Sequence, residues 1–142
     1  TELGHCYQVN DPTSEDISDL LDTDGGVVKI AAAHNIRKLH VFGAAILIFA
    51  ENGVWFISGS DSGTFNANNQ SVSKITEHGT LSSSSIVVVD GTVMYWSDDA
   101  IYHIKQTQVG DYTSEELSVN IRTLYQSISD ESKIIAQGIF NI

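Results

Sequence analysis

The chain has 142 residues, of which 42% are hydrophobic and 18% charged, and its formal net charge is −11. This length can enclose one hydrophobic core, and abundant Ser, Thr, Asn and Gly favour a sheet-rich protein over a helical bundle. Because the seven Lys and Arg are scattered through an acidic chain, the composition argues against binding to nucleic acid or to an anionic membrane.

Residues 1–35 are predicted to be an acidic lead-in, densest over residues 10–26, followed by a first strand at residues 27–33. The segment that starts at Asp22 resembles the beginning of a calcium-binding loop. An EF-hand loop needs oxygen ligands at its fifth and twelfth positions, which are Gly26 and Ala33 here. The segment is therefore interpreted as a solvated acidic turn.

An internal repeat organises the middle of the chain. A shift of 47 residues places residues 41–58 on residues 88–105. The matched pairs are Val41 with Val88, Ile46 with Val93, Phe49 with Trp96, Val54 with Ile101, Trp55 with Tyr102 and Ile57 with Ile104. Chance similarity between two β-rich stretches is the alternative, but turns match turns and aromatics match aromatics at one constant offset.

The first copy is assigned to residues 36–80. Strands are predicted at residues 39–42, 45–50 and 54–58, and residues 71–76 alternate polar and apolar as a half-exposed fourth strand does. Asn52-Gly53 is predicted to form the hairpin turn, because a type I′ turn needs positive φ at both central residues.

The second copy is assigned to residues 81–112. Strands are predicted at residues 86–89, 92–97 and 101–105, and Asp90-Gly91 is predicted to turn the chain between the first two. The inner strands of the first copy are apolar throughout, which implies burial on both faces. The fold class is therefore mainly β, with about two antiparallel blades of a β-propeller plus one helix near the C-terminus, and a β-sandwich is the alternative.

Residues 113–142 are predicted to form a helix and the start of a next strand. Thr113 and Glu116 have the spacing of a capping box, so the helix is expected over residues 113–128, and the strand over residues 133–142. The chain starts at Thr1 and ends inside an apolar stretch. We expect one structural domain that is a fragment of a longer chain.

The sequence indicates no catalytic, cofactor-binding or metal-binding residues, and we predict that the protein is not an enzyme. It has no phosphate-binding glycine loop, no HExxH motif and no metal-spaced Cys/His set. The single cysteine, Cys6, is expected to be a buried apolar residue. Asp98-Asp99 and the Asp-box-like residues 60–65 leave a propeller glycosidase open as a minor alternative. The aromatic residues Trp55, Phe56, Tyr95, Trp96 and Tyr102 lie in predicted strands and are interpreted as anchors of packing between sheets, with a sugar-stacking platform as the alternative. Phe49, matched with Trp96, is given the same packing role.

Several strings resemble one protein family. They are CYQVNDPTSEDISDLLDTDGG (residues 6–26), ILIFAENGVWFISGS (46–60), SVSKITEHG (71–79) and SIVVVDGTVMYWSDDAIYHI (85–104). In order and spacing they are similar to an internal segment of the tail nozzle proteins of short-tailed bacteriophages, also called tail tubular protein B. The similarity covers most of the chain and rests on packing and turn residues.

The resemblance implies a structural virion protein with a β-propeller, a subunit of a ring that closes the tail tube and helps retain and eject DNA. The ring is expected to be a homo-hexamer that contacts tail adaptor and tail fibre or spike proteins, assembles in the host cytoplasm and binds no membrane. DNA would pass without specific binding, for which an acidic lumen is suited. The family supplies no catalytic residue to carry over. A carbohydrate- or ligand-binding β domain of another virion or surface protein is the functional alternative.

Overall fold

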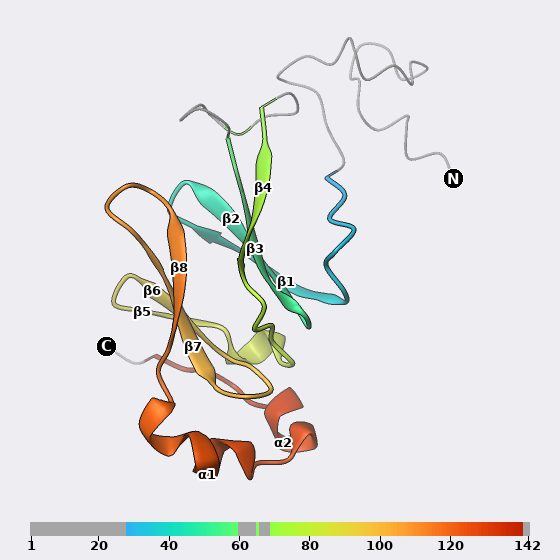
Figure 1. Ribbon diagram of the computed structural model, residues 1–142, viewed down its shortest axis with the longest axis vertical. Coiled ribbons are helices and arrows are strands. Elements are labelled where there is room, and N and C mark those ends of the chain that lie inside the picture. Colours follow the sequence, from blue (N-terminus) through green and yellow to red (C-terminus); the bar gives the residue numbers. More distant parts are fainter. Residues whose placement is uncertain (1–27, 60–64, 66–68, 141–142) are drawn as a thin grey trace.

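The structure is a computed structural model that describes residues 28–59, 65 and 69–140 (Figure 1). The acidic lead-in, Cys6, the calcium-like turn at Asp22 and most of the Asp-box-like segment lie outside the described residues. The described part is mainly β, as predicted: it holds two four-stranded antiparallel sheets.

The first sheet has the order β1-β2-β3-β4, with β1 at Ile36–Phe42, β2 at Ala45–Ala50, β3 at Gly53–Ser58 and β4 at Ser71–Thr76. The second sheet has the order β5-β6-β7-β8, with β5 at Val87–Val89, β6 at Thr92–Trp96, β7 at Ile101–Gln106 and β8 at Tyr112–Glu116. Two short helices follow, α1 at Arg122–Gln126 and α2 at Asp130–Ile134.

The two sheets share one strand register. Ile46 pairs with Ile57 and Phe49 with Val54 in the first sheet. The residues 47 positions later pair in the same way, Val93 with Ile104 and Trp96 with Ile101. The internal repeat of the sequence is therefore a repeat of backbone pairing through the first three strands of each sheet. The fourth strands depart from this offset, because Ser58 pairs with Ser71 whereas Lys105 pairs with Thr113.

The hairpin turns of the two sheets differ. Asp90 and Gly91 have φ values of 46° and 73°, as a type I′ turn requires. In the first sheet Ala50 pairs with Gly53, so the turn residues are Glu51 and Asn52 and the turn predicted at Asn52-Gly53 lies one residue too late. The Asn52 side chain accepts a hydrogen bond from the amide of His34 and donates one to the carbonyl of Ala32. The turn is thus fixed by a distant segment rather than by positive φ at Asn52.

The main core lies between the two sheets. The first sheet contributes the face that carries Leu47, Phe49 and Val54, and the second contributes the face that carries Val93, Tyr95, Tyr102 and Ile104. These seven side chains are buried, and the ring of Phe49 meets the ring of Tyr95 edge-on at 5.3 Å. Sheet-on-sheet packing of this kind stabilises both layers by removing apolar area from water.

A second, smaller core covers part of the other face of the first sheet. Ile48, Ala50, Trp55 and Ile57 are buried there, and Val28, Ile30 and Ala33 pack on them. The strand predicted at residues 27–33 is wrong for its described part, because residues 28–33 form an irregular segment with a turn that Ala33 closes by donating to the carbonyl of Ile30. This segment covers one end of the sheet without adding a strand to it.

The C-terminal region departs most from the sequence prediction. Thr113 and Glu116 lie in β8, paired with β7, so the capping box and the helix predicted over residues 113–128 are wrong. A short helix near the C-terminus is present, but it starts only at Arg122. Long-range strand pairing outweighs the local capping signal here. β8 supplies hydrogen-bonding partners to the backbone of β7, which would lack these partners if residues 113–116 formed a helix.

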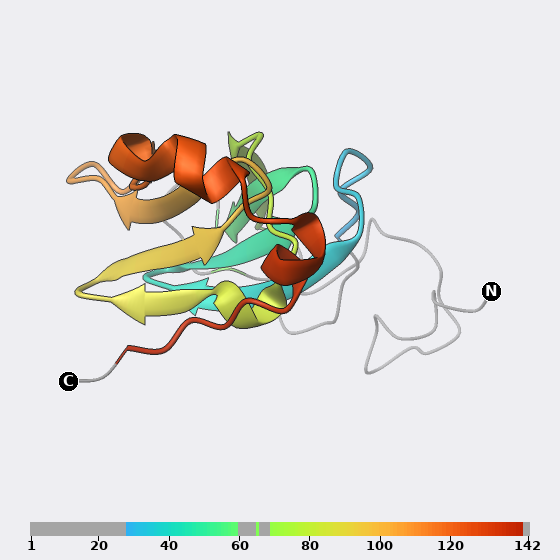
Figure 2. The same cartoon turned by 90° about the horizontal axis from the view of Figure 1, so that it is seen from below.

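The strand predicted at residues 133–142 is also wrong in its described part. Residues Asp130–Ile134 form α2, capped by the Ser129 side chain, which accepts a hydrogen bond from the amide of Ser132. Figure 2 shows the segment after α2 running alongside β5, where the amide of Gly138 donates to the carbonyl of Ser84 at 2.9 Å. The two helices lie at the lower end of the second sheet in Figure 1.

Candidate functional site

The two ends of the stacked sheets carry different features. A groove opens at one end, where the β1–β2 and β7–β8 turns lie. A polar network fills the other end, between the first sheet and the turn that joins β6 to β7.

The groove has a volume of about 540 Å³. It is lined by Ala44, Ala45, Phe56, Ser58, Gly59, Ser71, Ser73, Gln106, Val109, Gly110, Asp111 and Tyr112. The rings of Phe56 and Tyr112 lie 4.9 Å apart, and the Tyr112 hydroxyl donates to the carbonyl of Phe42 at 2.9 Å. Phe56 and Tyr112 therefore form an aromatic wall that connects the two sheets.

The chemistry of the groove favours an uncharged polar ligand. Its polar groups are hydroxyls, the Gln106 amide and backbone, and Asp111 is the one ionisable acid among its described lining residues. Rings beside hydroxyl and amide groups suit the apolar faces and hydroxyl groups of a sugar. No histidine or cysteine is among the described residues that line the groove.

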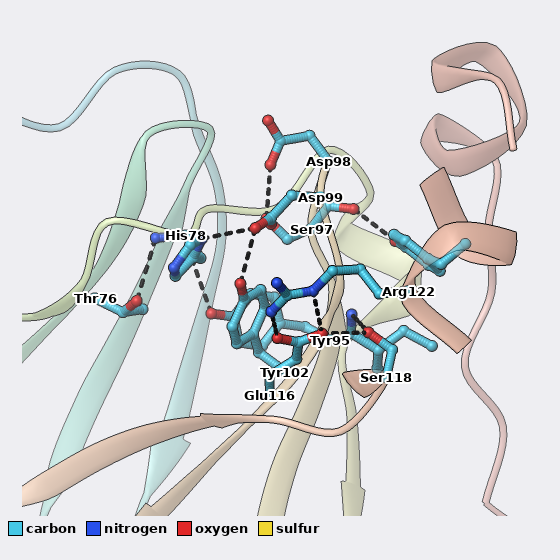
Figure 3. A network of polar contacts seen from close by, with 12 residues as sticks. Thr76, His78, Tyr95, Ser97, Asp98, Asp99, Tyr102, Glu116, Ser118 and Arg122 are labelled. Carbon is cyan, nitrogen blue, oxygen red and sulfur yellow. Dashed lines mark hydrogen bonds and ion pairs between the residues drawn. The ribbon is translucent and has the colours of Figure 1, made fainter. Parts of the chain in front are cut away.

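The polar network at the opposite end centres on Asp99, in the turn between β6 and β7 (Figure 3). The Tyr102 hydroxyl donates to Asp99 Oδ2 at 2.9 Å, and Nδ1 of His78 lies 3.3 Å from the same oxygen. The imidazole of His78 is also stacked on the ring of Tyr102 at 4.3 Å. His78 follows β4 of the first sheet, so these contacts tie the two sheets together.

The environment of Asp99 favours its ionised form. Burial by itself raises the pKa of Asp99, but the hydrogen bond from Tyr102, the charge of His78 and further hydrogen bonds outweigh it. The net result is a pKa below the ordinary value of 3.8. Asp99 Oδ1 is buried without a hydrogen-bond partner among the described residues, so the carboxylate is held from one side only.

A second acid extends the network towards α1. The Glu116 carboxylate accepts hydrogen bonds from the guanidinium of Arg122 and from the hydroxyl of Ser118. The hydrogen bond from Arg122 is the main reason that the pKa of Glu116 lies below its ordinary value. The Ser118 hydroxyl in turn accepts from the amide of Ile101 at 3.0 Å. These contacts hold the start of the helical segment against β7.

Two buried tyrosines anchor the network to backbone carbonyls. The Tyr95 hydroxyl donates to the carbonyl of His78 at 2.8 Å, and the Tyr125 hydroxyl donates to the carbonyl of Ser97 at 2.6 Å. Burial raises the pKa of both tyrosines well above the usual range, so both stay protonated donors. The contacts of the network join the segment after β4, the β6–β7 turn, β8 and α1.

The residues singled out in the sequence occupy several places. Phe49 lies in the core between the sheets and Trp55 in the smaller core, Trp96 is half-buried, and Asn52, Gly53, Asp90 and Gly91 lie at hairpin turns. Tyr95, Asp99 and Tyr102 join the polar network, and Phe56 lines the groove.

The sequence named some members of both features, Phe56, Tyr95, Asp99 and Tyr102, but predicted neither the groove nor the network. It gave no functional role to His78, and it paired neither Phe56 with Tyr112 nor Glu116 with Arg122. No local signal joins these residues, because each pair or cluster combines side chains from different strands or loops.

The part of the chain that the structure describes holds no group of three or more His, Cys, Asp or Glu side chains that could bind a metal ion. Among the same residues, no helix has both the length and the apolar character needed to cross a membrane. Comparison with protein-family models, with curated proteins and with solved structures gave no match.

Proposed function

We propose that this chain is a structural virion protein, a segment of the ring-shaped tail nozzle of a short-tailed phage, and that its two sheets are consecutive blades of a β-propeller. In this proposal the ring is a homo-oligomer, a hexamer, that contacts tail adaptor and fibre or spike proteins. It closes the tail tube, and DNA passes through it without specific binding. The protein is assembled in the host cytoplasm, acts in the virion and is not an enzyme.

The blade proposal rests on which faces of the two sheets pack together. Leu47 and Phe49 pack against Val93 and Tyr95. In the repeat, Val93 and Tyr95 correspond to Ile46 and Ile48, which lie on the opposite face of the first sheet. The sheets therefore stack front to back.

Packing through opposite faces distinguishes consecutive blades from a two-sheet sandwich whose sheets meet through the same face. When two units meet by the same face, their interface is self-complementary and the pair is complete. When they meet by opposite faces, each end keeps a face that can receive a further unit, as in propellers and solenoids. The sandwich alternative stays open for a chain of two sheets, but it gives no reason for equivalent residues to lie on opposite faces.

The virion role is supported by the order and spacing of the family-like strings and by the charge. A net charge of −11 repels the phosphate backbone, which suits a passage that DNA must slide through. The polar network also supports a structural role, since several of its contacts join different elements of the fold.

The proposal is tested on purified particles of the phage that encodes this chain. Antibodies raised against the chain, detected by gold labelling in electron microscopy, should mark the distal end of the tail. Label on the capsid, on non-viral cell material or nowhere on intact and opened particles would overturn the proposal. As a companion measurement, fluorescence anisotropy with a short DNA duplex should show no saturable binding at physiological salt.

The groove supports a second candidate function, binding of a carbohydrate. A glycan array screened with the whole chain should then give a saturable hit that Gln106→Ala and Asp111→Asn both weaken. Asp90→Asn, in the β5–β6 turn outside the groove, is the matched control and should leave binding unchanged. An array without a hit, or a hit that survives both groove substitutions, would reject this candidate.

A further inference from the structure

The first sheet has an open edge at β1. This strand pairs with β2 and, among the described residues, with no strand on its other side. Phe42 and Ala45 pair across a two-residue turn, and a pair that closes such a turn is hydrogen-bonded. Because hydrogen-bonded and non-hydrogen-bonded pairs alternate along an antiparallel ladder, the amide and carbonyl groups of Leu39 and Val41 point away from β2.

The other three edge strands have neighbours within the described part of the chain. β4 and β8 contact each other. β5 has only three residues, and the segment after α2 runs alongside it (Figure 2), where the amide of Gly138 donates to the carbonyl of Ser84. β1 has seven residues, and its Leu39 and Val41 are 61% and 72% exposed. β1 is therefore the long edge that stays accessible among the described residues.

Charged side chains commonly shield an edge strand from other strands, but those of β1 contact other elements. The guanidinium of Arg37 forms an ion pair with Glu51, in the β2–β3 turn. Nζ of Lys38 donates to the carbonyl oxygens of Ser83 and Ile86 at 3.3 Å and 3.4 Å. The Lys38 side chain is thus directed at the second sheet, and no carboxylate among the described residues neutralises its charge.

The two faces of β1 carry different side chains. Lys38 and His40 share the face that is turned towards the second sheet, whereas Leu39 and Val41 share the other face. Arg37 and Lys38 are also the one pair of adjacent basic residues in a chain of net charge −11. A strand added to this edge would place its own side chains beside those of β1 on each face. The matching strand therefore alternates acidic residues, beside the basic face, with apolar residues, beside the other.

We propose that the open edge of β1 binds an extended segment of a partner protein in which acidic and apolar residues alternate. The partner's backbone would hydrogen-bond to the amide and carbonyl groups of Leu39 and Val41, as in other cases of strand addition to a sheet edge. Its apolar side chains would lie beside those two residues, and its carboxylates beside Lys38 and His40. This inference rests on β1 and not on the proposed role in a phage tail.

The test measures fluorescence anisotropy of a labelled peptide of alternating Glu and Val, as long as β1 and blocked at both ends, titrated with the whole chain. Binding should be saturable and should weaken as salt is added, because salt screens exposed charges. The matched control is the same peptide with Lys in place of Glu. It should bind at least about tenfold more weakly, because like charges then lie beside Lys38.

Two substitutions at one position separate the backbone contact from the fold. Val41→Pro removes an amide that points away from β2, and proline is tolerated on an edge strand where no ladder hydrogen bond is lost. It should weaken binding of the Glu-Val peptide at least about tenfold. Val41→Thr keeps both the amide and a β-branched side chain, so it should retain most of the binding. Leu39→Pro replaces Val41→Pro if that variant shows no cooperative melt by circular dichroism.

Hydrogen exchange measured by NMR reads the edge directly. In the chain alone, the amides of Leu39 and Val41 should exchange faster than the amide of His40, which belongs to the ladder with β2. The Glu-Val peptide should slow the exchange of the first two amides and leave that of His40 little changed.

Four results would overturn the proposal. They are no saturable binding of the Glu-Val peptide, equal binding of the Lys-Val peptide, binding that survives a folded proline variant, and amides of Leu39 and Val41 that are already protected in the chain alone. The last result would mean that another part of this chain, or a second copy, occupies the edge. Gold labelling of the tail can fail while the peptide still binds, so this inference and the virion role fail separately.

Discussion

Phe49 and Trp96 hold corresponding positions in the two sheets, and each meets a tyrosine ring edge-on. Phe49 meets Tyr95 of the second sheet, and Trp96 meets Tyr125 of α1, both at 5.3 Å and an interplanar angle of 69°. The helical segment therefore presents to the second sheet the kind of contact that the second sheet presents to the first.

This relationship predicts two matched coupling energies. Double-mutant cycles of Phe49→Leu with Tyr95→Leu, and of Trp96→Leu with Tyr125→Leu, should each give a coupling of about 0.5–1.5 kcal/mol in urea unfolding, the usual value of an aromatic pair. A control cycle of Phe49→Leu with Tyr125→Leu should be additive, because the two rings belong to separate pairs. Additive effects within either pair would show that the ring contact contributes nothing beyond burial.

Trp55 tests the smaller core. Its side chain is 4% exposed beneath the segment of residues 28–33, and Lys74 Nζ lies 4.7 Å from its ring. Trp55→Ala should therefore lower the free energy of unfolding by about 3–5 kcal/mol. Lys74→Met, which keeps most of the side-chain length but removes the charge, should lower it by only about 0.5–1 kcal/mol. A cost below about 1 kcal/mol for Trp55→Ala would place the ring on a surface instead.

Gly53 and Gly110 form a matched pair for backbone strain. Gly53 has φ 149°, and a Cβ there would lie 2.6 Å from the carbonyl oxygen of Thr76. Gly53→Val should therefore cost more than about 2 kcal/mol, because strain and a backbone clash add. Gly110 has φ 93° but open space around it, so Gly110→Val should cost only the conformational strain of about 1–2 kcal/mol. Thermal melts that rank the two variants in the reverse order would contradict the clash at Gly53.

The lowered pKa of Asp99 predicts that the free energy of unfolding depends on pH. Because its pKa in the folded protein lies below the ordinary 3.8, its contribution to stability is present above that value and is lost as the pH falls through the lower folded pKa. Asp99→Asn should therefore be less stable than the unsubstituted chain near pH 7, and the difference should shrink below about pH 4.

Tyr102→Phe provides the companion measurement. It removes the hydrogen bond that contributes most to lowering the pKa of Asp99, so it should reduce the same acid-dependent difference without abolishing it. The measurement is the free energy of unfolding in urea at a series of pH values. Parallel curves for the unsubstituted chain and Asp99→Asn would show that the carboxylate does not stabilise the fold through its charge.

The strands and their equivalence could be predicted from the sequence, because they depend on neighbouring residues. The strand at β4 followed from alternation, the turn at Asp90-Gly91 from the tolerance of Asp and Gly for positive φ, and the match of Phe49 with Trp96 from one constant offset. Each of these signals is local or repeats at a fixed spacing. The shared register of the two sheets has the same origin.

The helix predicted over residues 113–128 was wrong because pairing with β7 outweighed the local capping signal. Thr113 and Glu116 have the spacing of a helix cap, yet β7 offers the backbone of residues 112–116 a row of hydrogen-bonding partners. Likewise, Asn52 is held by the segment of residues 28–35 through His34 and does not need the conformation that its own turn chemistry favours. Local propensities are small beside such long-range contacts.

The sequence by itself determined that this chain forms two related sets of strands with aromatic residues at matched positions. Only the tertiary structure decided that the sheets stack front to back and that Asp99 meets His78 and Tyr102. Periodicity and turn propensities depend on residues that are close in the sequence, so strands and turns can be predicted from short stretches of it. The choice of packed face and the meeting of polar side chains depend on the relative placement of whole sheets, which no short stretch of sequence specifies.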